Sequence, residues 1–185
     1  MSTNRHTYRH TVTGSLIGEL TLVADGEELV GLYFAHHWYR PDPATFGPRD
    51  DRGFAAATSR LGEYFAGERT AFDLPVRADG DEFQSAVWQR IAAIPYGETT
   101  TYGDIARDLG DPALARDVGA AVGRNPLCVV VPCHRVLGKG GALTGYAGGL
   151  RRKRFLLDLE AGRPWLSSVD TAVDTAVATA AGATG

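Results

Sequence analysis

The sequence has little cysteine and no long apolar run, and each absence excludes a class of protein. Its only cysteines, Cys128 and Cys133, stand in the segment CVVVPC, a spacing that fits neither a disulfide framework nor a zinc site. At least one of them is therefore expected to be free to react. No stretch approaches the ~18 consecutive apolar residues of a membrane-spanning helix, and the segment MSTNRHTYRH lacks the apolar stretch of a secretory signal. We expect a soluble, cytoplasmic protein with no membrane partner.

An excess of positive charge is also lacking, since the formal net charge of the 185 residues is -3. A negative average disfavours a nucleic-acid partner, because the phosphates bind basic surfaces. The charge is unevenly distributed, however. Residues 1–82 contain more acidic than basic residues, whereas residues 83–165 contain more basic ones. The second half is therefore the candidate binding half.

The first half shows the pattern of a small sheet with a helix. The segment SLIGELTLVADGEELVGLYF alternates partly around Asp25-Gly26, which predicts a β-hairpin. Residues 54–67 have the apolar spacing of a helix that ends at Gly67, and AFDLPV predicts a short strand. The polar segment ADGDE indicates a boundary. We predict an α+β fold with domains at residues 1–80 and 81–165.

The second half begins with three predicted helices. Asp81 can cap the first, whose apolar stripe ends at Pro95. The segments TYGDIARDLG and DPALARDVGAAVG predict two short helices that meet at Gly110-Asp111. This abrupt junction suggests a helix-turn-helix, although the same pattern is common in helical cores.

The face of the third helix opposite its apolar stripe is unusually smooth. It carries Arg116 among the small residues Gly119, Ala120 and Gly123. Because glycine costs roughly 1 kcal/mol of helix propensity relative to alanine, this smoothness requires a reason. Close approach to a nucleic-acid groove is one explanation, and packing against another part of the chain is the other.

The sequence places a thiol beside a possible base. Cys133 ends the apolar run VVVPC, which we interpret as a buried strand, and His134 follows it. A free thiol has a pKa near 8.5, so a nucleophilic role requires a neighbouring base or cation. His134 could serve, although neighbours on a strand point to opposite faces. Glu160, near the end of a predicted helix, could orient His134 or could be a solvated residue on an exposed rim.

Positive charge clusters where that last helix begins. The helix macrodipole disfavours cations there, so nearby phosphates would explain the cluster, which consists of Arg151, Arg152, Lys153 and Arg154. The preceding loop LGKGGALTGYAGGL surrounds Tyr146 with glycines and could let a flat ligand lie against the backbone. Its spacing matches no phosphate-binding motif. Residues 166–185 are small and nearly repetitive, and we predict a disordered tail.

Four motifs together resemble a known family. They are FQSAVWQRIAAIPYGETTTYGDIA, ARDVGAAVGRNP, VVVPCHRVLG and GALTGYAGGL, and in this order and spacing they closely resemble the O6-alkylguanine-DNA alkyltransferases, also called methylated-DNA-protein-cysteine methyltransferases. The resemblance covers about residues 81–165 strongly and the first half more loosely. It implies a small N-terminal antiparallel sheet with a helix, ribonuclease H-like, followed by a mainly helical domain with a helix-turn-helix.

The resemblance also implies a role for individual residues. Cys133 would accept the alkyl group, with His134 and Glu160 forming a hydrogen-bonded chain that generates the thiolate. Asn125 would brace the turn, and Tyr102 would rotate the target phosphate and donate to the base. Residues expected to line the base pocket are Tyr146, Ala147, Gly148 and Leu127. Residues expected at the DNA are the arginine finger Arg116 with Ala120, Gly123, Arg124 and Thr101.

The implied function is repair of double-stranded DNA that contains O6-alkylguanine, with O4-alkylthymine as an open possibility. The base would be flipped out through the minor groove and the alkyl group transferred irreversibly, so that each monomer acts once and needs no cofactor. Two departures stand out. Asp117 beside the finger should weaken docking, and the N-terminal histidines come without nearby cysteines, so no metal is expected.

Three alternatives remain at this stage. A sensor that binds lesions without repairing them would lack the acceptor cysteine, which is present here. An adaptive-response regulator would carry a further zinc-bearing cysteine domain. A thiol hydrolase could use Cys133, His134 and Glu160, but a helix-turn-helix with Arg116 argues against it.

Overall fold

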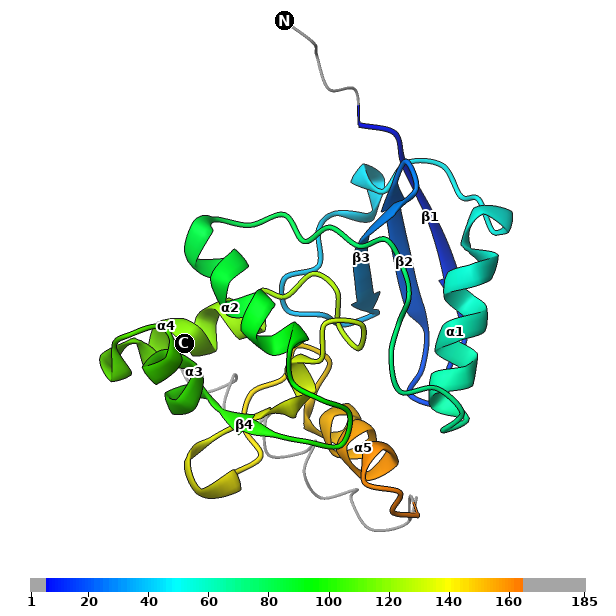
Figure 1. Ribbon diagram of the computed structural model, residues 1–185. Helices are drawn as coiled ribbons and strands as arrows, with labels where there is room; N and C mark the ends of the chain where they lie inside the picture. Colours follow the sequence, from blue (N-terminus) through cyan, green and yellow to red (C-terminus); the bar gives the residue numbers. More distant parts are fainter. Residues whose placement is uncertain (1–5, 165–185) are drawn as a thin grey trace, which may run out of the picture.

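The computed structural model describes residues 6–164. Its N-terminal half is an antiparallel sheet in the order β1-β2-β3, with strands at Tyr8–Thr13, Leu20–Asp25 and Glu28–Phe34. The hairpin expected at Asp25-Gly26 is present, and Gly26 adopts a positive φ of 58° that suits glycine in a tight turn. Helix α1, Ala55–Phe65, runs beside this sheet (Figure 1).

The strand expected at residues 71–76 is wrong. Only Val76 pairs, in an isolated bridge with Leu29, and the segment is otherwise extended without a ladder. Pro75 explains the difference, because proline has no N–H to donate and a continuous ladder requires one. The Pro75 carbonyl still accepts a hydrogen bond from Leu29 N at 2.9 Å, and Arg77 N donates to Leu29 O at 3.0 Å, so the backbone of the segment pairs with β3 around Leu29.

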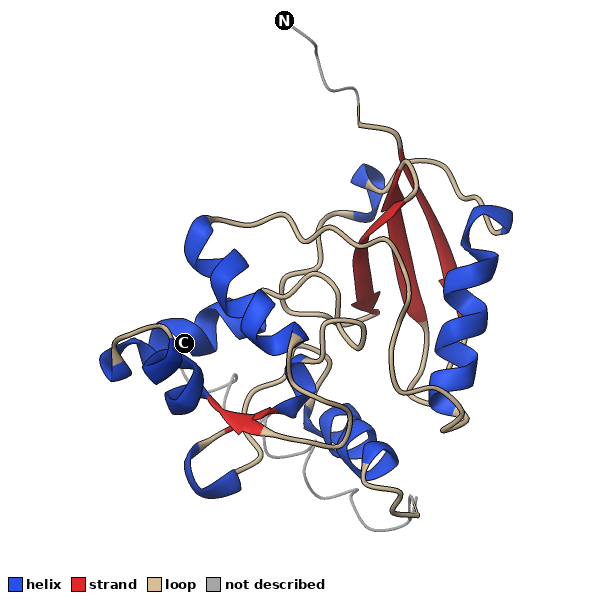
Figure 2. Ribbon diagram, in the orientation of Figure 1, coloured by secondary structure: helices blue, strands red, loops and turns tan. Residues whose placement is uncertain are grey.

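The second half is mainly helical (Figure 2). Helix α2, Glu82–Ala92, begins with a capping box in which Asp81 accepts from Gln84 N at 2.8 Å. Helix α3, Tyr102–Asp108, is followed by the 3-10 turn η3, Pro112–Leu114, and by α4, Ala115–Gly123. Helix α5, Leu150–Glu160, closes the described fold.

Short elements connect these helices. The strands β4, Thr100–Thr101, and β5, Val136–Leu137, pair in parallel. The remaining 3-10 turns are η1 at Pro43–Thr45, η2 at Arg52–Phe54, η4 at Cys133–Arg135 and η5 at Lys139–Gly141. The predicted α+β fold class is confirmed. The disordered tail predicted at residues 166–185 lies outside the described residues.

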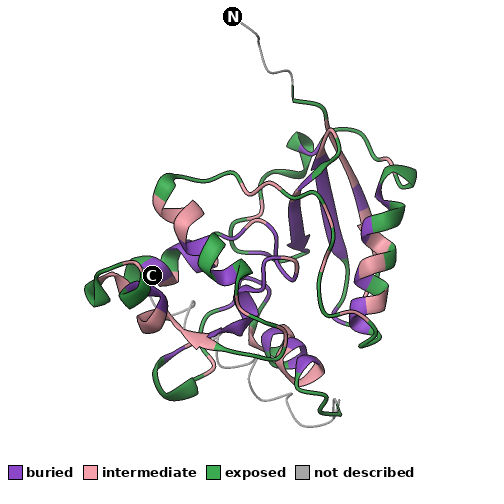
Figure 3. Cartoon of the chain, in the orientation of Figure 1, coloured by how far each residue is buried: buried purple, intermediate pink, exposed green. Residues whose placement is uncertain are grey.

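One apolar core extends through both halves, as the buried residues in Figure 3 show. It joins Leu22 and Phe34 of the sheet and Leu61 of α1 to Val87 of α2 and Leu156 of α5. Burial of such side chains contributes about 1.5–3 kcal/mol each. The sheet and the helical half are therefore held against each other by the same core that fixes the site.

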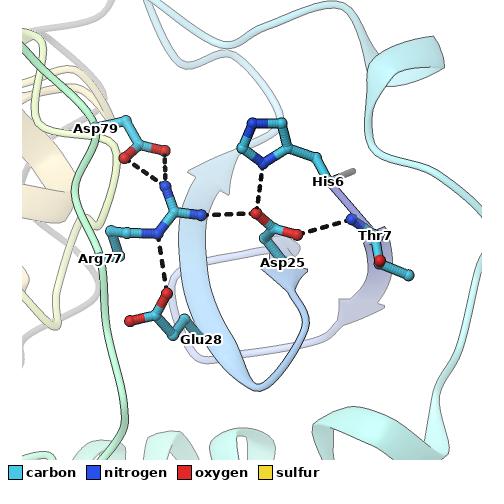
Figure 4. A network of polar contacts seen from close by, with 6 residues as sticks. All are labelled: His6, Thr7, Asp25, Glu28, Arg77 and Asp79. Atoms are coloured by element: carbon cyan, nitrogen blue, oxygen red, sulfur yellow. Dashed lines mark hydrogen bonds and ion pairs between the residues drawn. The ribbon is translucent and has the colours of Figure 1, made fainter. Parts of the chain in front are cut away.

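A surface network fixes the segment between the halves (Figure 4). Arg77 donates to Asp25 Oδ2 at 2.7 Å and to Glu28 Oε2 at 2.9 Å, and it also pairs with Asp79. Asp25 in turn accepts from Thr7 N at 2.8 Å. Charge-assisted hydrogen bonds such as these are short and directional, so the connection is anchored to the β2–β3 turn and to the start of β1.

None of the helices within residues 6–164 is long and apolar enough to cross a membrane.

Candidate active site

Two tight turns bring the two cysteines together. Val130 N donates to Cys128 O at 2.9 Å around Val129, whose φ is 73°. Cys133 N then donates to Val131 O at 2.8 Å around Pro132. These are three-residue γ-turns, and the one with positive φ is rare and strained. The strand expected over this apolar run is therefore wrong, because the chain reverses there instead of extending.

Asn125 holds this reversal in place. Its side-chain amide donates to Val131 O at 2.8 Å, and its carbonyl oxygen accepts from Leu127 N at 3.0 Å. The side chain is almost fully buried, and a hydrogen bond in such a place is stronger than one exposed to water. Because both ends of the turn bind one side chain, a conformation that is unfavourable for a β-branched residue such as Val129 can persist. Asn125 thus braces the turn.

The Cys133 thiol is buried beside a second thiol. Its exposed fraction is 2%, and its Sγ lies 3.8 Å from Cys128 Sγ. A hydrogen bond from Cys128 lowers the pKa of Cys133, and the ammonium of Lys153 acts in the same direction, whereas burial opposes them. The same contact raises the pKa of Cys128. Of the two thiols, Cys133 is therefore the one that loses its proton more readily.

Glu160 is not on an exposed rim; it is buried at the centre of a hydrogen-bond network. Its Oε1 accepts from His134 Nε2 at 2.8 Å and from the Tyr64 hydroxyl at 2.6 Å. Arg135 donates from Nη2 to Oε1 and from Nε to Oε2, each at 2.8 Å, and Gly97 N donates to Oε2 at 3.2 Å. A bidentate arginine with further donors is the environment in which a buried carboxylate is stable.

The network sets the protonation states of its members. Burial alone would raise the pKa of Glu160, but the hydrogen bonds from His134 and Arg135 hold it well below its usual range. Burial lowers the pKa of His134, and the bond to Glu160 opposes this only in part. His134 is therefore a neutral imidazole with its proton on Nε2. Its Nδ1 is buried without a hydrogen-bond partner among the described residues, which leaves a lone pair able to take a proton.

A hollow opens beside Cys133. It is lined by Trp38, Tyr102, Gly119, Val122, Gly123, Cys133, Gly145, Tyr146 and Ala147, and its volume is about 40 Å³. Three of the residues expected around the base, Tyr102, Tyr146 and Ala147, thus line the hollow beside the acceptor sulfur, and Gly123, expected at the DNA, lines it as well. Leu127 and Gly148 do not line the hollow. A side chain at position 148 would lie 2.4 Å from the Phe34 ring, so this glycine permits close packing of the loop on the sheet.

The basic cluster at the start of α5 has structural partners. Lys153 is fully buried and donates to Val136 O at 2.6 Å and to Thr144 O at 2.7 Å. Arg152 donates to Ile17 O at 2.6 Å and to Gly148 O at 2.8 Å. The prediction that nearby phosphates account for these two cations is therefore wrong, because both side chains donate hydrogen bonds to backbone carbonyls of the protein itself. Lys153 also fixes the glycine-rich loop against the site.

Helices α3 and α4 present the smooth face to the outside. Arg116 and Ala120 are exposed, and Arg116 makes no hydrogen bond or ion pair with any residue between 6 and 164. The Arg124 guanidinium lies 5.1 Å from the centre of the Tyr39 ring. Thr101 is the N-cap of α3, and its hydroxyl lies 2.6 Å from Asp104 Oδ2. Gly119 and Gly123 pack near Tyr102 and Tyr39.

Several residues of the site were not found from the sequence. Tyr64 and Arg135 complete the hydrogen-bond network of Glu160. Lys153 donates to Val136 O, three residues after Cys133, and Trp38 of the N-terminal half lines the hollow. Arg135 directly follows the Cys-His pair, and that position could have suggested its role. Nothing in the local pattern around Tyr64 or Trp38 distinguishes them from core or surface aromatics. Within residues 6–164, no three His, Cys, Asp or Glu side chains are placed to hold a metal ion.

This geometry defines a class of protein: a mixed α/β chain with a buried, activated thiol beside a histidine-carboxylate pair. The comparisons with known proteins specify it further. A sequence model described as the DNA binding domain of 6-O-methylguanine DNA methyltransferase matches residues 82–162, and one described as its ribonuclease-like domain matches residues 8–78.

Individual relatives agree with these matches. The methylated-DNA-protein-cysteine methyltransferase of Mycobacterium tuberculosis is 48% identical over 149 residues, which are 80% of this chain and 90% of that protein. Its counterpart in Methanosarcina acetivorans is 43% identical over 151 residues, 82% and 97% of the two chains. The crystal structure of Mycobacterium tuberculosis OGT in complex with DNA has a TM-score of 0.77 at 46% identity, covering 84% of this chain and 93% of that one. The chain belongs to the 6-O-methylguanine DNA methyltransferase family.

Proposed function

We propose that this protein repairs DNA by moving the alkyl group of an O6-alkylguanine onto Cys133. The observation that carries the proposal is the environment of this sulfur. A buried thiol with a lowered pKa lies next in the chain to a neutral histidine, whose Nε2 is held by a buried carboxylate. Family membership and the relative solved with DNA support a double-stranded DNA partner.

In the transfer, one alkyl group moves from the guanine to Cys133, and a net of one proton moves from Cys133 to the guanine. His134 Nδ1 takes the proton of Cys133, and a bridging water is suited to this step because no direct hydrogen bond joins the two side chains among the described residues. The thiolate attacks the alkyl carbon, the S–C bond forms and the C–O6 bond breaks. The electron pair remains on the guanine, which takes up a proton as it leaves. Tyr102, whose hydroxyl lies 3.4 Å from Thr144 O in the wall of the hollow, can donate to it.

The product is a thioether that water does not reverse. None of the side chains that the structure describes around the sulfur offers a hydrolytic route, so each molecule acts once. The lowered pKa of Cys133 suits this reaction, because the thiolate is the nucleophile of the single displacement. No later step restores the free thiol.

Base flipping is part of the proposal. A hollow of about 40 Å³ holds only a few waters, so a purine can enter only if the walls move. The parts of the wall expected to move belong to loops. They are the Trp38 side chain, which is 63% exposed, and residues 145–147. Extrusion costs least for a damaged, poorly paired base, so selection would begin before chemistry. O4-alkylthymine would have to enter the same hollow.

The docking surface we propose is the helix-turn-helix of α3, η3 and α4. Its small residues allow the close approach that a narrow minor groove requires, and Arg116 is free to enter the stack after the base leaves. Ala120, Gly123, Arg124 and Thr101 would lie along the backbone. We expect one protein monomer to act on one lesion. Because the proposed partner is chromosomal DNA, we also expect the protein to lie with the chromosome in the cytoplasm.

The domain boundary near residue 80 also remains a proposal. The separate family matches on either side support it. The shared core and the Tyr64–Glu160 bond mean that the first domain contributes directly to the site of the second.

The test is the intact mass of the protein after incubation with a duplex containing O6-methylguanine, for the wild type and for Cys133→Ala. A gain of one methyl group in the wild type alone, mapped to Cys133, is expected. A wild type that binds the lesion without a change in mass would instead be a sensor.

A further inference from the structure

Cys128 is not the alkyl acceptor, yet its sulfur lies 3.8 Å from that of Cys133. Both side chains are buried, at 0% and 2% exposure. The γ-turn at Val129 and the amide bonds of Asn125 hold the turn that carries them. The pair is therefore a fixed feature of the fold, and the sulfurs need not be brought together by a large motion.

We propose that Cys128 is a resolving cysteine, which converts an oxidised Cys133 into a reversible disulfide. The oxidant belongs to the class of hydroperoxides, with hydrogen peroxide as the simplest. It reaches Cys133 through the hollow beside it, which accommodates molecules of about the size of water. This role goes beyond alkyl transfer and depends on the proposed function only for the reactivity of Cys133.

The chemistry has two balanced steps. The Cys133 thiolate attacks one peroxide oxygen, the O–O bond breaks, and sulfenic acid forms while the other oxygen leaves as hydroxide and becomes water on protonation. Cys128 then attacks the sulfenic sulfur, the S–S bond forms, and the sulfenic hydroxyl leaves as water with the thiol proton. Two thiols are oxidised by two electrons, and one peroxide is reduced to two waters.

The surroundings of Cys128 favour the second step. Its proton is held while Cys133 is a thiolate, because the hydrogen bond between the sulfurs raises the pKa of Cys128. This cause disappears once Cys133 has become a neutral sulfenic acid. His37 Nδ1 lies 3.9 Å from Cys128 Sγ, and burial lowers the pKa of His37 to about 4, so its imidazole is neutral. It can orient the Cys128 thiol, whose proton passes to the sulfenic hydroxyl as that group leaves as water.

The disulfide requires a local adjustment, because the sulfurs must approach from 3.8 Å to the roughly 2 Å of an S–S bond. While it exists, Cys133 cannot accept an alkyl group. In the disulfide, Cys133 is also protected from further oxidation to sulfinic or sulfonic acid, and thiol reductants cannot return these acids to the free thiol. A protein that is used once would otherwise lose its acceptor permanently to oxidation.

The experiment exposes the reduced wild type to hydrogen peroxide, denatures it in N-ethylmaleimide and measures the intact mass. We expect the loss of two hydrogen masses with no maleimide added, and full recovery of two labelled thiols after dithiothreitol. Trypsin should release residues 125–135 as one peptide, since Arg124 and Arg135 flank both cysteines. That peptide should carry the missing hydrogens.

Cys128→Ser is the matched variant, because a hydroxyl can still donate to the thiolate but cannot form a disulfide. Under the same peroxide it should gain oxygen at Cys133 and should be trapped by dimedone, which the wild type resists. A wild type that keeps both thiols, or that gains oxygen at Cys133 while Cys128 still labels, would overturn the proposal. Methyl acceptance by the reduced wild type is measured separately, so failure of the disulfide and failure of alkyl transfer are distinguished.

Discussion

The hydroxyl of Tyr64, in α1, donates a 2.6 Å hydrogen bond to Oε1 of Glu160, at the end of α5, across 96 positions of the chain. The sheet half thereby completes the network that holds His134. Both partners are buried, and a hydrogen bond to a charged group in such a place contributes about 1.5–3 kcal/mol.

Tyr64→Phe should therefore lower the free energy of unfolding by about 1.5–3 kcal/mol and slow alkyl transfer from free O6-benzylguanine, because Glu160 holds His134 less firmly. Urea denaturation and the rate of thiol alkylation are the measurements. Tyr96→Phe is the control, since this ring packs 6.1 Å from that of Tyr64 and loses only a hydroxyl. Equal effects of the two variants would contradict the role of the bond.

The acid side of the stability curve should depend on Glu160. Its folded-state pKa lies below the ordinary value of 4.5, so its contribution is fully present above that pH and is lost as the pH falls below it. Glu160→Gln leaves Arg135 buried without its charge partner and should cost about 3 kcal/mol or more near pH 7.

The difference between wild type and Glu160→Gln should shrink as the pH is lowered through 4, since the unfolded chain takes up a proton at Glu160 there while the folded protein does not. Urea titrations at several pH values measure it. A difference that stays constant from pH 7 down to pH 3 would show that the carboxylate is not held in its charged form.

Arg116→Ala should slow repair in duplex DNA by roughly tenfold or more, a loss of about 1.4 kcal/mol, while the reaction with free O6-benzylguanine is unchanged. Only the duplex offers a stack for the guanidinium to fill. Arg52→Ala, an exposed arginine of the N-terminal half, removes the same charge and is the control. An equal loss on both substrates would argue against base flipping by Arg116.

Asp117→Asn should tighten binding to duplex DNA by up to roughly fivefold, the factor that ~1 kcal/mol of repulsion represents. Asp117 is exposed in the first turn of α4, where the helix dipole favours it, so a small loss of stability should accompany the gain. Fluorescence anisotropy at increasing salt is the measurement, and the difference should fade as charges are screened. Glu19→Gln changes the same charge outside this helix, and an equal gain there would indicate only a net-charge effect.

Local rules predicted the elements whose causes are local. The helix cap at Asp81, the turn at Gly26 and the helix at residues 150–160 depend on neighbours within a few positions. The strand expected before Cys133 failed because Asn125 and the positive φ of Val129 reverse the chain there. Apolar composition predicts burial in such a run, but it does not distinguish a strand from a braced turn.

The sequence by itself determined the thiol with its adjacent histidine, the helices, the resemblance to a family and hence the list of candidate residues. Only the tertiary structure decided that Glu160 is buried and charged, that Lys153 binds carbonyls and that Cys128 faces Cys133. The reason is physical. Partners of Glu160 come from α1, the loop after α2 and the turn at Cys133, and no spacing along one element encodes a contact among three. Burial and pairing are set by the common core, which forms only when both halves pack together.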